Sequence, residues 1–435
     1  MIINFEFKNY RSYKEECFFT MQRASNLKSM KDSIETNYKD VLSMVAAVYG
    51  ANASGKSNFL RGLNTVSEMV QGKKMISYTH QQFKLSEKTY KKDTEYRVTF
   101  VANDGQKYIY EYHYGSRGVS FEELNVYVTQ KPSLLFRRKQ KRDSSDFVFG
   151  ERFTSDSVKN MIIEETEISP RTLLLAVLRG WNEKVTQPAY EYLADGIHFV
   201  EAFAYRREYQ QMRRRIKDDT EFMYYINKVL PAIDLGVSDV SISKPNDSFI
   251  DRVTKILNRN GDPIERSELI DEATSVEFRH YGDSEIHSSI RESDESNGTK
   301  AALVFFGLFY DALKDGFTCL IDEMESSLHP ILVAKLIEIF NDKRTNPNGA
   351  QLIFTTHDIS LIENYAEGEV LDRDQIWFAE KNKKGESELY PLTSVQDMPR
   401  EGSNIGMKYI HGRYGATPDI SLLDVLLELN RDKKN

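Results

Sequence analysis

A chain of 435 residues with 40% hydrophobic and 29% charged residues has the composition of an ordinary globular protein. It is long enough for one large domain with an insertion, or for two domains. Its two cysteines, Cys17 and Cys319, lie far apart in apolar surroundings, which argues against a disulfide framework or a zinc site and favours a reducing compartment. The formal net charge of −8 means that any contact with nucleic acid needs a local basic patch.

We expect the protein to have neither a leader nor a membrane span. No basic stretch is followed by a long apolar run near the N-terminus, and no window approaches the roughly eighteen apolar residues that a spanning helix requires. We therefore expect a cytoplasmic protein with no membrane partner.

The N-terminal third is expected to be rich in strands. Alternating apolar residues from Ile3 to Phe7 predict a strand that enters a turn at residues 9–12, and a second strand is expected around residues 17–21. The apolar run 42–49 precedes a Gly-rich turn, which is typical of a buried parallel strand with a helix after it. Residues 95–149 alternate and contain an Asn-Asp-Gly turn, so they predict an antiparallel β arm.

The pattern changes twice in the rest of the chain. Residues 155–231 have helical periodicity, and residues 244–297 are poor in apolar residues and predict loops with a strand at 276–281. An α/β alternation then returns, with helices from Thr299 and Pro330 and strands at 317–321 and 351–354. The predicted organisation is an N-terminal half-core with the β arm (1–152), a helical insert (153–235) and a C-terminal half-core (236–435).

The strongest motif is Gly-Ala-Asn-Ala-Ser-Gly-Lys-Ser at residues 50–57, a complete G-x-x-x-x-G-K-S between an apolar strand and a helix. The glycines let successive backbone N–H groups face a phosphate, and the helix N-terminus adds partial positive charge. Lys56 is expected to meet the β- and γ-phosphates and Ser57 to ligate Mg²⁺, so ATP and Mg²⁺ are the predicted cofactors. The residues assigned to the nucleotide here are Gly50, Asn52, Ser54, Gly55, Lys56, Ser57 and Asn58.

A second motif ends an apolar strand with two carboxylates, Asp322 and Glu323, at the edge where α/β sheets bind ligands. We expect Asp322 to hold Mg²⁺ through water and Glu323 to be catalytic, by orienting or deprotonating the attacking water. The alternative is a pair of acids that only aids solubility.

Two weaker motifs complete the set. His357 follows the apolar strand at 351–354 and could reach a γ-phosphate as a second catalytic residue, although taken alone it could be structural. Ser296 and Gly298 precede a helix, where a hydroxyl and a glycine suit phosphate oxygens; taken alone they could form an ordinary N-cap.

The order and spacing of these motifs resemble the ABC-type ATPases of the SMC, RecF and OLD-nuclease branch. The opening IINFEFKNYRSY is similar to the NFRSF start of that branch, which implies that Arg11 lies near the nucleotide. SNGTK stands in place of the ABC signature, IDEMESSLHP combines Walker B with a D-loop, and FTTHD resembles the switch histidine. The fold implied is an α/β P-loop NTPase of ABC type with an antiparallel β arm and a helical insertion.

More narrowly, SNGTK, DEMESSLHP and residues 408–418 look like the stand-alone AAA/ABC-like ATPases of bacterial antiphage systems, including abortive-infection, RloB-associated and PARIS-type loci. This resemblance implies a homodimer or higher oligomer with composite ATP sites, in which Ser296 and Gly298 of one protomer meet the P-loop of another. Gln82 is the predicted Q-loop ligand of Mg²⁺. Because SNGTK replaces the transporter signature, an exporter subunit is not expected. If ATP closes the dimer and hydrolysis releases it, the protein suits a switch or sensor, so slow turnover is expected.

The preferred hypothesis is therefore an ATPase that senses phage infection and controls a separately encoded effector, either a nuclease or an RloB/TOPRIM-like protein. One rival is a RecF/SMC-like DNA-repair ATPase that binds DNA in an ATP-dependent way. A second rival is a scaffold that binds ATP structurally and hardly hydrolyses it.

Three further segments each admit more than one interpretation. The basic runs 137–142 and 213–215 could contact nucleic acid or an acidic protein, but solvated faces of a hairpin and a helix are the simpler interpretation. Asp372 and Asp374 match the D-x-D of a TOPRIM nuclease, but the following residues predict a plain hairpin.

Overall fold

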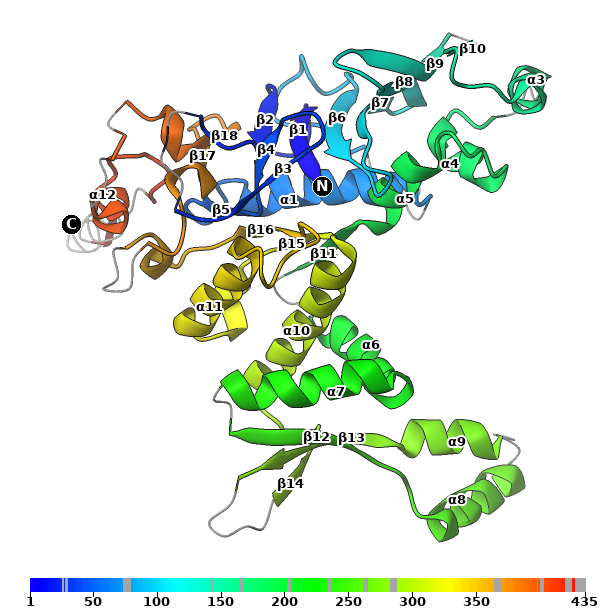
Figure 1. The fold of residues 1–435 in the computed structure, drawn as a ribbon, viewed down its shortest axis with the longest axis vertical. Coiled ribbons are helices and arrows are strands. Elements are labelled where there is room, and N and C mark those ends of the chain that lie inside the picture. Colours follow the sequence, from blue (N-terminus) through cyan, green and yellow to red (C-terminus); the bar gives the residue numbers. More distant parts are fainter. Residues whose placement is uncertain are drawn as a thin grey trace, which may run out of the picture.

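The structure is a computed structural model, shown in Figure 1, in which two large sheets occupy one end and a small third sheet lies at the other end. It describes the chain apart from residues 26, 28–29, 73–79, 142–143, 165–167, 202–204, 234–235, 261–264, 282–287, 364–368, 397, 400–402, 419–424 and 427–435.

A six-stranded sheet forms the core. All its strands run parallel except β18, which pairs with β17 as a hairpin. Every residue of β5 is buried, as expected for a parallel strand covered on both faces. In spatial order the strands are β11 (Ile197–Val200), β15 (Thr318–Ile321), β16 (Gln351–Thr355), β5 (Val45–Tyr49), β17 (Ile376–Lys381) and β18 (Ser387–Pro391).

A seven-stranded antiparallel sheet forms the second layer and includes the predicted β arm. The Asn-Asp-Gly turn joins β6 to β7, with Gly105 at a φ of +73° that glycine adopts without strain. The predicted arm is thus confirmed, and it continues the sheet begun by the N-terminal strands. In spatial order the strands are β10 (Ser145–Phe149), β9 (Pro132–Gln140), β8 (Gly118–Tyr127), β7 (Lys107–Gly115), β6 (Thr94–Val101), β1 (Ile2–Lys8) and β2 (Cys17–Thr20).

Helix α1 (Lys56–Val70) lies between the two sheets (Figure 1). Its apolar residues share one buried cluster with the antiparallel sheet and with Ala46 and Val48 of β5. The alternate residues Val45 and Ala47 face the opposite cluster, which includes α10 (Asn297–Asp315) and α11 (Pro330–Asn341). The period of two along β5 therefore divides the protein into two apolar layers.

The segment predicted as a helical insert is more closely tied to the core than the sequence suggested. It contains helices, but β11 within it pairs in parallel with β15 and forms an edge of the core sheet. Four residues with partial burial give too short a pattern to be recognised among helices. The helices are α3 (Asp156–Glu164), α4 (Leu174–Gly180), α5 (Gln187–Asp195), α6 (Tyr205–Asp218) and α7 (Thr220–Val229).

Residues 237–291, placed by the sequence in the C-terminal half-core, instead carry a separate three-stranded sheet and two helices. The strand expected at 276–281 is present as β13, but α8 and α9 were expected to be loops. Polar residues dominate this segment and obscure its helical periodicity. The elements are β12 (Val237–Ser243), α8 (Asp247–Asn260), α9 (Arg266–Ala273), β13 (Ser275–His280) and β14 (Ser288–Arg291).

Small elements complete the described chain. They are the strands β3 (Ser33–Glu35) and β4 (Val41–Ser43), helix α12 (Ile405–Ile410) and the 3-10 turns η1 (Leu230–Ile233), η2 (Met324–Ser327), η3 (Ile359–Ile362), η4 (Arg373–Gln375) and η5 (Leu392–Ser394).

None of the helices in the described part of the chain combines the length and apolar character that a membrane crossing needs.

Candidate nucleotide-binding site

The P-loop connects β5 to the N-terminus of α1, as the motif requires. Two of its glycines are needed for space and conformation. A Cβ on Gly50 would lie 2.3 Å from the Ala379 carbonyl oxygen, and Gly55 has a φ of +120°. Only glycine fits these positions, so the loop backbone can curl tightly at the start of the helix.

Lys56 is buried inside this loop. Its ammonium donates to the carbonyl oxygens of Gly50 at 2.8 Å and Ala51 at 3.1 Å. Burial lowers the pKa of Lys56 to about 8, against the opposing effect of the nearby carboxylates of Glu323 and Asp322. The ammonium charge of Lys56 is thus held at the centre of the loop by uncharged carbonyl oxygens. A phosphate anion would bind this ammonium more strongly than they do.

Asp322 lies at the end of β15 and accepts two hydroxyl hydrogen bonds on the same oxygen. Ser57 donates to Asp322 Oδ1 at 2.9 Å and Thr355 donates to it at 2.7 Å. The Thr355 hydroxyl oxygen also accepts the backbone N–H of Glu323 at 2.8 Å. One buried threonine, which was not singled out from the sequence, therefore orients both acids of the Walker B motif.

Glu323 begins a sharp turn. Its φ of 51° and ψ of 60° place it in the left-handed region, which costs a residue with a side chain on the order of 1–2 kcal/mol. The turn ends the strand and places Glu323 in the wall of the P-loop cavity. Backbone strain of this kind is common at functional sites, where the surrounding structure maintains it.

His357 follows β16 beside the same sheet edge. Its backbone N–H donates to Glu325 Oε1 at 2.5 Å. Burial and the Lys56 ammonium lower the pKa of His357, so its imidazole is neutral at pH 7. Burial raises the pKa of Glu325, another residue not singled out from the sequence. Glu325 thus links the turn after β15 to the backbone of His357.

A cavity of about 250 Å³ opens over the P-loop. It brings together Glu323 and the predicted P-loop residues apart from Gly50, and it adds two cations that the sequence did not single out, Arg61 and Lys381. The lining residues are Asn52, Ala53, Ser54, Gly55, Lys56, Ser57, Asn58, Arg61, Glu323 and Lys381.

Arg11 lies next to this cavity but does not line it. Its Nη1 donates to Asn58 Oδ1 at 3.3 Å, and the Asn58 amide donates to Ser12 Oγ at 2.9 Å. Arg11 instead lines an adjoining cavity of about 600 Å³ between α1 and β11, a cavity that also contains Arg61. The N-terminal turn is thus linked to the P-loop through Asn58.

Gln82, predicted as a Q-loop ligand of Mg²⁺, is placed elsewhere. Its amide donates to the Tyr90 carbonyl oxygen at 3.2 Å, and it lines neither the P-loop cavity nor the adjoining one. Its neighbour Gln81 accepts the Arg11 backbone N–H at 2.6 Å through its carbonyl oxygen. This arrangement gives the Gln82 assignment no support.

Ser296 and Gly298 lie at the N-terminus of α10, and neither residue lines the P-loop cavity. Figure 1 shows α10 running between the core sheet and the small sheet. The Ser296 hydroxyl oxygen accepts the Thr299 backbone N–H at 3.0 Å, so it is an N-cap. Glu295 accepts the Ser296 backbone N–H at 2.8 Å and pairs with His280 of β13 at 2.7 Å. The predicted signature residues are therefore not brought to the P-loop of their own chain.

Several arginines of the two basic runs bind other parts of the protein. Arg138 is fully buried and donates to the carbonyl oxygens of Thr172 and Ser169, and Arg137 pairs with Glu123. On α6, Arg213 pairs with Glu292, and Arg215 pairs with Asp219 and Asp311. Arg142 lies outside the described residues. These runs are mainly structural, which weakens the interpretation that they bind nucleic acid.

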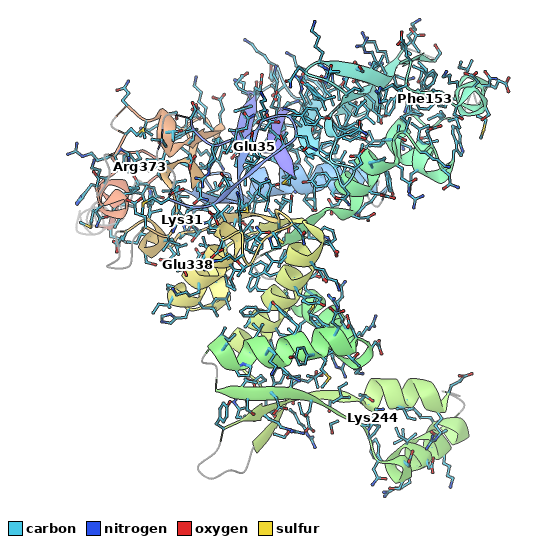
Figure 2. All side chains as sticks on the ribbon, viewed as in Figure 1. Lys31, Glu35, Phe153, Lys244, Glu338 and Arg373 are labelled. Carbon is cyan, nitrogen blue, oxygen red and sulfur yellow. The ribbon has the colours of Figure 1, made fainter. Side chains whose placement is uncertain are left out.

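The D-x-D pair is also bound internally. Arg23 donates to Asp372 at 2.7 Å and to Asp374 at 2.9 Å, and all three side chains are buried. The backbone N–H of Lys31 also donates to Asp372, and Figure 2 marks this junction by the labels Lys31 and Arg373. Carboxylates held in this way fasten the N-terminal segment to the core and are not arranged to bind a metal.

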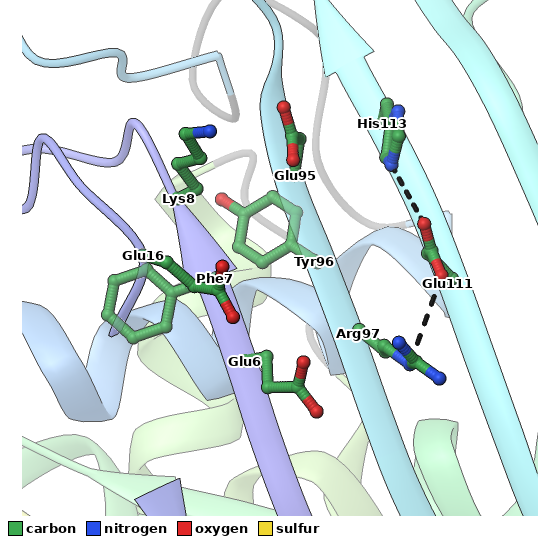
Figure 3. Close-up of a pocket in the computed structure, with 9 residues that line it drawn as sticks. All are labelled: Glu6, Phe7, Lys8, Glu16, Glu95, Tyr96, Arg97, Glu111 and His113. Atoms are coloured by element: carbon green, nitrogen blue, oxygen red, sulfur yellow. Dashed lines mark hydrogen bonds and ion pairs between the residues drawn. The ribbon is translucent and has the colours of Figure 1, made fainter. Parts of the chain in front are cut away.

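A separate shallow pocket lies on β1, β6 and β7 of the antiparallel sheet (Figure 3). Glu111 pairs with His113 at 3.0 Å and with Arg97 at 3.9 Å, as the dashed lines show. Burial raises the pKa of Glu6 in the same pocket. The acids here are partly paired with neighbours on the sheet, and the pocket holds none of the predicted site residues.

The residues at the P-loop suit a magnesium nucleotide. The crowded glycine backbone, the buried lysine held by two carbonyl oxygens, and a carboxylate beside a serine hydroxyl supply the donors and acceptors that a triphosphate and Mg²⁺ require. With the antiparallel sheet packed over α1, the chain is an α/β P-loop NTPase of the ABC-ATPase type.

Family comparison agrees with this class. Residues 45–363 match the family described as "AAA domain, putative AbiEii toxin, Type IV TA system", and the chain belongs to that family. No curated protein matches the chain.

Similar solved structures include an SMC head bound to the C-winged helix domain of ScpA, at 16% identity and a TM-score of 0.42, covering 89% of this chain and 96% of that one. RecF with ATP, a recombination mediator, shows 12% identity and a TM-score of 0.39, covering 89% and 97%. An SMC head domain with an extended coiled coil, in a ScpA complex from Pyrococcus furiosus, shows 13% identity and a TM-score of 0.38, covering 89% and 95%.

Proposed function

We propose that the protein hydrolyses ATP with Mg²⁺ at a composite site formed by two copies of the chain. The observation that carries the proposal is the network of Ser57, Asp322, Thr355 and Glu323, which places two acids of different role beside a P-loop. Asp322 is hydrogen-bonded and buried, whereas Glu323 lies in the cavity wall. This division suits a metal-holding acid and a water-activating acid.

Each residue then has a separate task. The P-loop N–H groups and Lys56 bind and orient the phosphates, and Ser57 and Asp322 would hold Mg²⁺. When bound, Mg²⁺ neutralises phosphate charge and orients the phosphates for in-line attack. Glu323 orients the attacking water and accepts its proton, and the neutral His357 donates a hydrogen bond near the terminal phosphate.

The second copy supplies the N-terminus of α10. In this proposal Ser296 and Gly298, which do not line the P-loop cavity of their own chain, bind the phosphates at a partner's site. ATP bound from both sides stabilises the dimer, and hydrolysis removes those contacts, so nucleotide state controls assembly. A dimer or higher oligomer that cycles slowly follows from this arrangement.

We further propose that this switch belongs to a bacterial antiphage system and controls a separately encoded effector, a nuclease or an RloB/TOPRIM-like protein. Two things support this role: the motif resemblance to such ATPases, and the family description, which refers to an AbiEii toxin of a type IV TA system. A separate effector is favoured because Asp372 and Asp374, the nuclease-like pair of this chain, are bound to Arg23.

The alternative is a RecF/SMC-like repair ATPase that binds DNA in an ATP-dependent way, which the same motifs permit. The internal pairing of the basic runs disfavours it. Titration of duplex DNA with and without Mg-ATP separates the two hypotheses. Tight, salt-dependent binding that needs ATP would support the repair hypothesis and contradict the sensor hypothesis.

The central test measures phosphate release and mass in solution with Mg-ATP for the wild type and for Glu323→Gln. We expect slow hydrolysis by the wild type, none above background by the variant, and nucleotide-dependent assembly of both. A wild type that binds ATP without turnover would instead identify a structural nucleotide scaffold. A monomer indifferent to ATP would disprove the composite site.

A further inference from the structure

Arg61 lies one turn below Ser57 on the same face of α1. Residues i and i+4 are neighbours on a helix, and side chains point back toward the N-terminus. The Arg61 side chain therefore extends toward the P-loop and lines its cavity, on a different element from Lys381. It also lines the adjoining larger cavity, so it stands at the boundary between the two.

Glu201 holds Arg61 in this place. Its carboxylate Oε1 accepts from Arg61 Nε at 2.9 Å. Glu201 directly follows β11, whose Val200 carbonyl oxygen accepts the Asp322 backbone N–H at 3.0 Å. The pair Arg61–Glu201 thus runs parallel to the pair Ser57–Asp322, from the same helix face to the ends of two adjacent strands.

The Arg61 guanidinium has capacity left for a ligand. Among the described residues, Glu201 is the partner recorded for it, and only Nε is used, although a guanidinium carries five N–H donors. Both side chains of the pair are partly exposed, at 32% and 46%, so the pair adds little to stability. A ligand in the cavity, bound by the remaining N–H donors of Arg61, therefore explains the position of this pair better than a gain in stability does.

The cavity has a charge balance suited to a polyphosphate. Lys56, Arg61 and Lys381 line it, against one acid, Glu323. Arg61 shares a helix face with Ser57, whose partner Asp322 follows β15, and the proposed function puts the terminal phosphate and the attacking water on this side. A planar guanidinium binds phosphate oxygens through paired hydrogen bonds, which gives both charge and orientation.

From this geometry we propose that Arg61 binds the terminal phosphate of a nucleoside triphosphate and that Glu201 positions it through Nε. Arg61 then distinguishes a triphosphate from a diphosphate, because its donors face a phosphate that only the triphosphate has. The inference rests on the proposed function of the P-loop site. It adds a specificity-determining cation to the phosphate-binding groups of the chain itself.

The test is calorimetric titration with the non-hydrolysable triphosphate AMP-PNP and with ADP, both with Mg²⁺. Arg61→Gln should weaken AMP-PNP binding about 10- to 100-fold and ADP binding much less. Glu201→Ala should weaken AMP-PNP binding about threefold in the wild-type background, and not at all beside Arg61→Gln, because a positioning residue acts only through its partner. Arg97→Gln, from an exposed Arg–Glu pair elsewhere, is the matched control and should change neither affinity.

Two results would overturn the inference while leaving the P-loop function intact. One is an Arg61→Gln variant that loses affinity for AMP-PNP and ADP by the same factor, or for neither. The other is a Glu201→Ala effect that persists undiminished in the Arg61→Gln background. Failure of the proposed function looks different, because the wild type would bind neither nucleotide, or Lys56→Ala would bind both as well as the wild type does.

Discussion

The P-loop cavity and the two basic runs both gather cations, but the structure uses those cations differently. In the runs, Arg138 and Arg215 are bound to carbonyl or carboxylate oxygens of distant segments and hold the arm and α6 in place. In the cavity, among the residues that the structure describes, Lys56 is bound by carbonyl oxygens of its own loop and Lys381 has no ion pair.

The difference shows that density of charge along the sequence is a poor guide to a ligand site. A cation whose hydrogen-bond donors are taken up by fixed partners within the protein has already recovered the free energy lost on leaving water, so a ligand gains little from it. Arg61 differs, because among the described residues Glu201 uses only its Nε and the other donors remain. A cation held by neutral oxygens in a cavity still gains from an anion. Four substitutions, two at the P-loop site and two in the basic runs, test whether the site serves a ligand and the runs serve the fold.

The largest effect is expected at the cavity acid. Glu323→Gln keeps the size of the side chain and its place in the turn but removes the proton acceptor, so ATP hydrolysis should fall about 10³-fold while AMP-PNP affinity stays within about twofold. Phosphate release and calorimetry measure the two quantities. Hydrolysis at the wild-type rate would exclude Glu323 as the catalytic base.

Next comes the arm. Arg138→Ala leaves Glu122 buried without the opposite charge nearby and removes hydrogen bonds to Thr172 and Ser169, so the free energy of unfolding should drop by about 3–5 kcal/mol. Denaturant unfolding measures it. If Arg138 were a nucleic-acid contact, stability would hardly change; Lys139→Ala, on the same strand but exposed, is the matched control.

The orienting threonine should have a moderate effect. Thr355→Val is close in volume but cannot donate to Asp322 or accept from Glu323, so hydrolysis should fall about tenfold. Thr355→Ser restores the hydroxyl and should recover most of the rate. A serine variant as slow as the valine variant would show that packing of the methyl group, and not the hydrogen bonds, explains the loss.

The smallest effect is expected at Arg214, an exposed member of the α6 run. Arg214→Gln should change the free energy of unfolding by less than about 0.5 kcal/mol and leave nucleotide affinity unaltered. Duplex DNA binding at several salt concentrations provides the opposing test. A shallower salt dependence in the variant would mean that this residue contacts phosphates.

The sequence predicted the elements that depend on local pattern. The P-loop, the strand before it and the hairpin at Gly105 follow from short motifs, and the structure contains them. The short strand β11 and the polar helix α8 were missed, because their patterns are too short or too hydrophilic to stand out. These two elements depend on contacts with distant parts of the chain, and a single sequence does not reveal those contacts.

The site divides in the same way. Ser57, Asp322 and Glu323 could be predicted because each stands at a fixed place beside a buried strand or helix. Thr355 ends a buried strand just before His357, so its position could have suggested a role. No motif in the sequence pointed to Arg61 or Lys381. They line the P-loop cavity only because the fold brings their elements together there.

The length of α10 turns small rotations into large displacements. Its 19 residues span about 28 Å, with Ser296 at one end and Gly316, next to the core strand β15, at the other. A tilt of about 5° at the core end moves the signature end by roughly 2.5 Å, nearly the length of a hydrogen bond. In the composite site proposed above, such a tilt would make or break a phosphate contact at the partner's site while the packed core beneath the helix scarcely deforms.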